Sequence, residues 1–116
     1  LDGPVRAVLA QGFDVRLASN AWYSGAYLLE TVPTVMYILA RHGHEPVVAM
    51  EEAVNETRDN DTIASIVGGA MGAAHGTAWI PQRWIDGLLG RTQEDDDGRV
   101  FELIEAAVDR FVPREH

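Results

Sequence analysis

The sequence contains no cysteine among its 116 residues. Disulfide frameworks, thiolate nucleophiles and zinc–thiolate sites are therefore excluded. Basic residues are also few, with nine Lys and Arg against eighteen Asp and Glu and a net charge of −9. Because no basic stripe offsets repulsion from a phosphate backbone, we expect no nucleic-acid partner. The lack of cysteine is compatible with the cytoplasm, which is the location that we expect.

Phosphate-binding loops and membrane segments are missing as well. Neither G-x-x-x-x-G-K-[ST] nor G-x-G-x-x-G occurs, which excludes nucleotide-binding folds of those two classes. The uncharged stretch 63–80 contains four glycines and several polar residues, so it is too weakly hydrophobic for a membrane span. The first residues show no basic segment followed by an apolar run, as a signal peptide would. We therefore expect no membrane association.

Apolar residues recur at helical spacing along most of the chain, and no strand pattern competes. Pro33 is expected to kink its helix or to split it after Thr31, and the pattern assigns no element to residues 13–22. The fold class is therefore all-α, as a single domain over residues 1–116 or as part of a larger helical domain. The predicted helices run from Pro4 to Gly12, from Tyr23 or Ser24 to Gly43, from Pro46 to about Glu56, from Asn60 or Asp61 to about His75, from Pro81 to Gly90, and through Val100 to Phe111.

Small residues form a ridge on the fourth of these helices. Ala64, Gly68, Gly72 and Gly76 recur every four residues and so share one face. Each Gly costs about 1 kcal/mol against Ala inside a helix, so its repetition indicates a packing reason. We expect a second helix or a ligand to approach this backbone closely. The alternative is a helix that merely tolerates its glycines.

The start of the same helix carries the most informative chemistry. Asp59, Asp61 and Thr62 place two carboxylates and a hydroxyl within four positions, and hard cations such as Mg²⁺, Mn²⁺ and Ca²⁺ prefer such ligands. At a loop-to-helix junction the backbone turns, so both carboxylates can converge on one point. An EF-hand is excluded, because Ala64 and Ala70 stand where that loop needs Gly and Glu. Spacing alone favours a second interpretation, in which the acidic residues only cap the helix and complement its dipole.

Other candidates are weaker. His42 and His44 could bind a transition metal, but histidines near a helix end are more often surface residues beside its C-terminal dipole. His75, near the end of the glycine-rich helix, is ambiguous in the same way. Ser24-Gly25 has the composition of a nucleophile turn, yet the strand that such a turn requires before it is missing.

Several segments taken together resemble one known family, the ADP-ribosylglycohydrolases, which include the glycohydrolase that reactivates dinitrogenase reductase. That family has a D-x-D-T-x-A motif, a glycine-studded helix after it, an I-P-x-x-W segment and an earlier S-G-Y-x-x-D/E-T region. The combination is far more specific than any single motif. The matching segments here are Asp59–Ala64, the glycines Gly68, Gly72 and Gly76, Ile80-Pro81 with Trp84 and Leu88, and Ser24–Thr31.

This resemblance implies an orthogonal all-α bundle and a hydrolase that cleaves the glycosidic bond between ADP-ribose and an amino-acid side chain, or acts on related ADP-ribose derivatives. It implies two Mg²⁺ or Mn²⁺ ions, with Asp59, Asp61 and Thr62 as metal ligands rather than caps. Tyr27 would line the ADP-ribose pocket. Arg58 stands where the family often has Gly, and its guanidinium could meet a phosphate oxygen. The alternative is a non-catalytic helical domain that binds an ADP-ribose-like ligand or another protein, or one whose helices are purely structural.

One part of the family pattern is missing. Family members carry a Thr-Asp-Asp motif in a preceding N-terminal half, and this sequence has no Thr-Asp-Asp. The resemblance therefore predicts that the chain is the C-terminal half of the fold, and the start at Leu1 rather than Met agrees with a processed product or a fragment. We expect the isolated chain to bind metal poorly and to be inactive until a complementary N-terminal segment or subunit completes the site.

Overall fold

The computed structural model describes residues 3–88 and 99–113. Within these ranges the chain forms seven helices and no strand, which confirms the all-α prediction. No helix in the described ranges is both long and apolar enough to cross a membrane. The chain divides into two compact units, Leu1–Trp79 and Ile80–His116.

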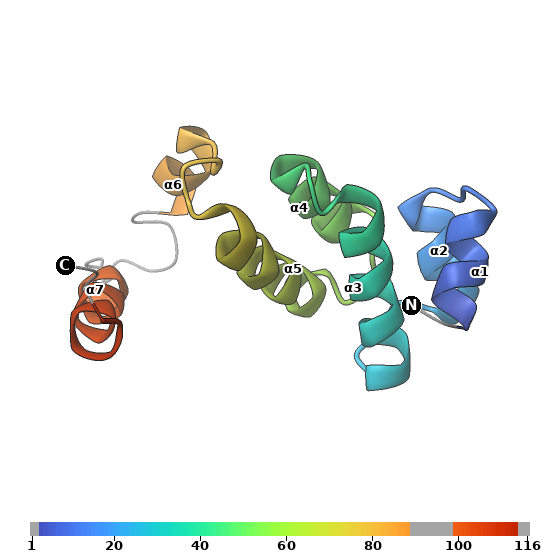
Figure 1. Ribbon diagram of the computed structural model, residues 1–116, viewed down its shortest axis with the longest axis horizontal. Coiled ribbons are helices and arrows are strands. Elements are labelled where there is room, and N and C mark those ends of the chain that lie inside the picture. Colours follow the sequence, from blue (N-terminus) through green and yellow to red (C-terminus); the bar gives the residue numbers. More distant parts are fainter. Residues whose placement is uncertain (1–2, 89–98, 114–116) are drawn as a thin grey trace. The chain divides into compact units, whose positions relative to one another are not determined.

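The first unit is built around one central helix. In Figure 1, α3 lies between the pair α1 and α2 and the pair α4 and α5, and it packs against all four. The helices of this unit are α1 (Pro4–Ala10), α2 (Val15–Trp22), α3 (Leu28–His42), α4 (Pro46–Asn55) and α5 (Asn60–His75).

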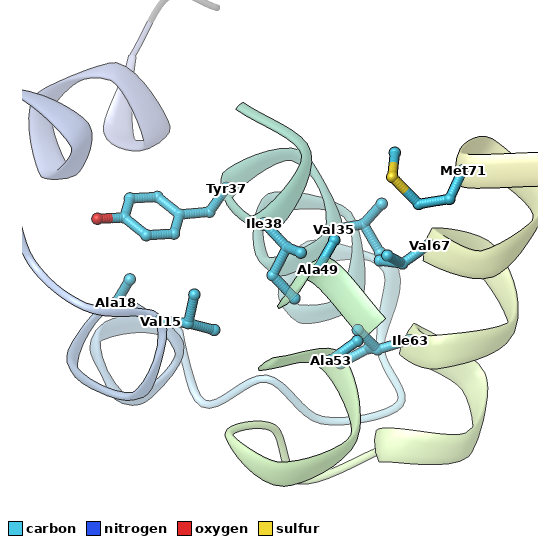
Figure 2. Close-up of a cluster of buried hydrophobic side chains, with 10 residues drawn as sticks. All are labelled: Val15, Ala18, Val35, Tyr37, Ile38, Ala49, Ala53, Ile63, Val67 and Met71. Atoms are coloured by element: carbon cyan, nitrogen blue, oxygen red, sulfur yellow. The ribbon is translucent and has the colours of Figure 1, made fainter. Parts of the chain in front are cut away.

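Buried side chains from α2 to α5 form the core of this unit. On α3, Val35 and Ile38 lie toward α4 and α5, whereas Tyr37 lies toward α2 (Figure 2). Because Tyr37 lies on a different face of α3 from Val35 and Ile38, this one helix joins both halves of the core. The hydroxyl of Tyr37 donates to the carbonyl of Phe13, which ties α3 to the loop before α2. The buried hydrophobic residues are Val15, Ala18, Val35, Tyr37, Ile38, Ala49, Ala53, Ile63, Val67 and Met71.

The helix α2 is missing from the sequence prediction. Asp14 begins this helix by accepting the N–H of Leu17 at 2.8 Å, as expected of an N-cap. Val15, Ala18 and Trp22 recur at helical spacing and pack in or against the core. The local signal was therefore present, although short and interrupted by polar residues.

The predicted start of the second helix at Tyr23 or Ser24 is wrong, because α3 begins at Leu28. Tyr23 ends α2 in the left-handed region, with φ of 70°. Ser24 and Gly25 are then buried, and the carbonyl of Ser24 accepts the N–H of Asp59. The segment 23–27 is therefore held by a hydrogen bond to Asp59, far along the chain, and continues neither α2 nor α3.

The proline within α3 does not split it. The helix continues unbroken from Leu28 to His42 with Pro33 inside it, so the predicted division after Thr31 is wrong. Pro33 lies in the second turn, where it removes a single helical hydrogen bond, the one that its N–H would make to Leu29.

The small-residue ridge on α5 packs at its N-terminal end, where Ala64 lies against the core and Gly68 meets α4. A methyl group placed on Gly68 would lie 3.3 Å from the sulfur of Met50 on α4. Around Gly72 and Gly76, no heavy atom of the described residues lies within 4 Å of such a methyl. The predicted approach of a second helix is therefore observed at Gly68, and the approach of a ligand to the rest of the ridge stays a prediction.

The second unit contains α6 (Gln82–Leu88) and α7 (Arg99–Phe111). Neither helix has a buried residue. The sequence of α7 is amphipathic, yet Phe111 is 79% exposed and Leu103 is 64% exposed. Both helices lie close to the ranges that the periodicity predicts.

Candidate metal centre

Asp59 occupies the N-cap position of α5 without capping it. Its backbone has φ of −89° and ψ of 62°, and its side chain accepts no N–H from the first turn. Its carbonyl begins the helix by accepting the N–H of Ile63 at 3.0 Å. The capping interpretation therefore does not account for the carboxylate of Asp59, which remains available for a ligand.

Asp61 lies in the first turn, next to Asp59. The N–H of Thr62 donates to Oδ1 of Asp61 over 2.9 Å. This bond, together with a hydrogen bond involving the side chain of Asp59, holds the pKa of Asp61 below its ordinary value. The two carboxyl groups thus lie within hydrogen-bonding reach of each other. Asp61 is exposed and Asp59 is half-buried, so a dissolved cation could reach both.

Thr62 completes the trio of predicted ligands. It is exposed on the first turn of α5, where its carbonyl accepts the hydroxyl of Ser65 at 2.8 Å. In the part of the chain that the structure describes, the hydroxyl of Thr62 itself makes no hydrogen bond, and it is free to bind a ligand.

Arg58 stands immediately before this trio. Its guanidinium carbon lies 4.4 Å from the centroid of the Tyr23 ring, which is a cation–π contact. Its backbone N–H donates to Oγ of Ser24 at 3.1 Å. Because stacking uses the face of the guanidinium, its in-plane N–H groups remain able to meet an anion.

Tyr27 is placed less directly. It is 77% exposed at the start of α3, and its carbonyl accepts the N–H groups of Glu30 and Thr31, each at 2.8 Å. Among the described residues, no hydrogen bond or ring contact joins Tyr27 to Arg58 or Asp59. The structure therefore brings the side chains of Asp59 and Asp61 together, places Thr62 in the same first turn of α5, and leaves the roles of Arg58 and Tyr27 as predictions.

The sequence did not predict that Ser24 and Tyr23 contribute to this site. Ser24 is fully buried, and its hydroxyl and carbonyl accept the N–H groups of Arg58 and Asp59. Tyr23 provides the ring under Arg58. The resemblance included Ser24 within a motif, but a pairing with residues 34 positions away has no local signal. Tyr23 lies outside that motif.

A shallow apolar groove lies between α3 and α5. Its volume is about 240 Å³. Ile66, one turn after Thr62 on α5, lies at one side, and Leu28, at the start of α3, lies at the other. The lining residues are Leu28, Thr31, Val32, Val35, Met36 and Ile66.

The described residues contain no group of three or more His, Cys, Asp or Glu side chains that could hold a metal ion. Asp59 and Asp61 are therefore a pair of carboxylates rather than a full cage. Two of the histidines considered as alternative ligands engage other groups, since Nε2 of His75 lies 2.7 Å from the carbonyl of Gly43 and His44 faces Glu45. Nδ1 of the third, His42, is buried and has no hydrogen-bond partner among the described residues.

A comparison with protein families identifies the family of the chain. The family model described as ADP-ribosylglycohydrolase matches residues 3–115. The chain belongs to the ADP-ribosylglycohydrolase family. Comparisons with curated proteins and with solved structures gave no match. The resemblance noted from Asp59–Ala64 and its accompanying motifs is thus confirmed at the level of the ADP-ribosylglycohydrolase family, over nearly the whole chain.

Proposed function

We propose that this chain forms part of a metal-dependent ADP-ribosyl hydrolase in which Asp59, Asp61 and Thr62 hold Mg²⁺ or Mn²⁺. One observation carries the proposal, which is that two carboxyl groups lie side by side while the one at the N-cap position caps nothing. Two ionised carboxylates this close repel each other. A divalent cation between them would convert that repulsion into attraction, and the hydroxyl of Thr62 is a compatible third ligand.

The residues of the chain would divide the work. When bound, two such ions would position ribose hydroxyls and activate a water molecule for hydrolysis of the glycosidic bond. The protein supplies fixed ligands, because the N–H of Thr62 orients the carboxylate of Asp61 and the Ser24 turn holds the backbone of Asp59. The chemistry implies an ADP-ribosylated side chain or a related ADP-ribose derivative as substrate.

We assign Arg58 to the diphosphate of that substrate. Its guanidinium is exposed and adjoins the carboxylate pair in sequence, and stacking on Tyr23 reduces the freedom of its side chain. A planar, permanently charged group held in this way suits a phosphate oxygen. The exposed ring of Tyr27 provides a wall for the nucleoside portion, as the family pattern suggests.

The centre needs further ligands, which we propose come from a complementary N-terminal segment or subunit. Two carboxylates and one hydroxyl can hold one Mg²⁺ or Mn²⁺ ion whose remaining ligands are waters, but they leave a second ion without protein ligands of its own. The groove between α3 and α5 supports this proposal. Its apolar wall suits the apolar face of a helix rather than a diphosphate. Leu28 and Leu29 beside it are 77% and 89% exposed, which is unusual for adjacent large apolar residues.

Metal titration tests the assignment of the ligands. Isothermal calorimetry with Mn²⁺ should show binding to the wild-type chain that falls at least tenfold in Asp59→Asn and in Asp61→Asn. Asp14→Asn is a matched control, because Asp14 caps α2 through Leu17 and is assigned no metal. Equal Mn²⁺ affinity in all four proteins would remove the metal site.

Ligand binding tests Arg58 separately. Arg58→Ala should weaken ADP-ribose binding by the metal-loaded protein about tenfold, because a hydrogen bond to a charged group contributes about 1.5 kcal/mol. Adenosine, which lacks the diphosphate, serves as the control ligand and should bind both proteins alike. Unchanged affinity for ADP-ribose would exclude a phosphate-binding role.

Activity tests the need for a complement. The purified chain alone should not hydrolyse ADP-ribosylated peptides, and adding the N-terminal half of a family member should restore hydrolysis. Robust hydrolysis by the chain alone would contradict an incomplete centre. Metal-independent binding of ADP-ribose without hydrolysis in any combination would instead favour a non-catalytic binding domain.

A further inference from the structure

We infer that Ser24 is a positioning residue. It holds the backbone of Arg58 and Asp59, the loop before α5, so that the carboxylate of Asp59 faces Asp61 instead of capping the helix. This inference rests on the proposed function. Two consecutive N–H groups of the loop end on this one residue. That of Arg58 donates to Oγ of Ser24 and that of Asp59 donates to its carbonyl, each at 3.1 Å. Ser24 is 0% exposed, so water does not compete for these bonds.

The backbone of Asp59, directly after these two bonds, is unusual for an N-cap residue. An N-cap residue ordinarily has extended dihedral angles, and its side chain accepts an N–H of the first turn. Asp14 at α2 follows this rule, with ψ of 169° and a bond from Leu17. Asp59 departs from it, with ψ of 62° and no capping bond. The N–H groups of Arg58 and Asp59 belong to the two peptide planes on either side of Arg58, so the two bonds fix the direction in which the chain enters Asp59.

The turn that carries Ser24 is held on both sides. Before it, Tyr23 has φ of 70° and its ring is covered by the guanidinium of Arg58. After it, the carbonyl of Gly25 accepts the hydroxyl of Thr31 at 2.8 Å. A methyl group on Gly25 would lie 2.3 Å from Oε2 of Glu30 and 3.3 Å from Cδ1 of Tyr23, so a larger residue here would displace the end of the Glu30 side chain. These contacts fix the position of Ser24, and Ser24 in turn fixes the position of the loop at Arg58 and Asp59.

Amide exchange in the metal-free chain tests the contact itself. In Ser24→Ala the amide of Arg58 should exchange about fivefold faster, the loss that a typical hydrogen bond predicts. The matched control is Ser19→Ala. Ser19 is also buried and its hydroxyl donates to the carbonyl of Glu56, so the same substitution is made nearby without touching the bonds of Arg58 and Asp59. Unchanged exchange at Arg58 in Ser24→Ala would overturn the inference.

Paramagnetic broadening by Mn²⁺ then tests the consequence. The amide signals of Asp61 and Thr62 should broaden in the wild-type 116-residue chain. The Mn²⁺ concentration for half-broadening should rise about tenfold in Ser24→Ala, as for other residues that support metal ligands. It should stay unchanged in Ser19→Ala and recover in Ser24→Thr, which keeps the hydroxyl.

The outcomes separate this inference from the proposed function. Equal Mn²⁺ affinity in wild type and Ser24→Ala refutes the positioning role and leaves the metal site standing. An equal loss in Ser24→Ala and Ser19→Ala also refutes it, because general loosening of the unit then accounts for the effect. Absence of broadening in the wild type at millimolar Mn²⁺ counts against the proposed function itself, and Ser24 then has no ligand to position.

Discussion

Replacing Asp59 by alanine distinguishes a metal ligand from a helix cap. In the structure, Asp59 stands at the N-cap of α5 but accepts no N–H from the first turn. Asp14 stands at the N-cap of α2 and accepts the N–H of Leu17 at 2.8 Å. Both helices belong to the first compact unit. Asp14→Ala is therefore an internal reference for what a real cap contributes.

The expected magnitudes differ between these two sites. Removing a capping aspartate costs about 1 kcal/mol of stability, and this is the loss that we expect for Asp14→Ala. Asp59→Ala breaks no capping bond. It removes a favourable interaction with the helix dipole, typically about 0.3–1 kcal/mol, but it also relieves the repulsion from the neighbouring Asp61. These effects oppose each other, so we expect a net change within about 0.5 kcal/mol.

The measurement is urea unfolding of the three proteins at pH 7, followed by far-UV circular dichroism, first in EDTA and then with Mn²⁺. In EDTA only Asp14→Ala should be destabilised. At Mn²⁺ ten times its dissociation constant, the wild type and Asp14→Ala should each gain about 1.4 kcal/mol. Asp59→Ala should gain little.

A different pattern would refute the reasoning. If Asp59→Ala lost as much stability in EDTA as Asp14→Ala, the side chain of Asp59 would be a cap in solution. If Mn²⁺ then stabilised all three proteins equally, Asp59 would have no part in holding the ion, and the proposed centre would lose the residue on which it depends.

Three further outcomes are expected. The side chain of Asp61, followed by NMR titration, should titrate below the ordinary value of about 3.9, chiefly because its carboxylate accepts the N–H of Thr62. The contribution of Asp61 to stability is present above the ordinary pKa and is lost as the pH falls through the lowered pKa. A midpoint at or above the ordinary value would contradict the geometry. Gly72→Ala should raise the free energy of unfolding of the chain by up to about 1 kcal/mol, because a methyl there meets no neighbouring atom. A lower free energy of unfolding in urea would mean that the ridge is covered in solution. Ile63→Ala should cost about 2–5 kcal/mol in the same assay, since Ile63 is fully buried, and a loss under 1 kcal/mol would place α5 outside the core.

Local signals predicted α5 almost to the residue. A polar Asp59-Asn60 pair precedes it, apolar residues recur through it, and Gly76 follows it with φ of 71°. These features act within a few residues of one another, so periodicity and end signals suffice to find them. Asp59, Asp61 and Thr62 also stand out locally, but their spacing alone favoured helix capping, and only the family resemblance predicted them as metal ligands.

The start of α3 could not be predicted in this way. Nothing in Tyr23–Tyr27 forbids a helix by composition. These residues remain outside a helix because Ser24 and Gly25 are buried and hold a loop 34 residues further along. That contact forms only when both segments meet in the folded chain, so the sequence pattern of either segment alone does not predict it.

The sequence by itself determined the all-α class, most of the helix ranges, the family and the presence of a carboxylate pair ahead of a glycine-rich helix. The tertiary structure alone decided that Asp59 does not cap its own helix, that Ser24 and Tyr23 contact the residues before α5, and that an apolar groove lies between α3 and α5. The physical reason is the range of the interactions. Helical spacing and helix ends follow from neighbours a few positions apart, whereas the hydrogen bonds that hold Arg58 and Asp59 come from a turn that only the folded chain brings near.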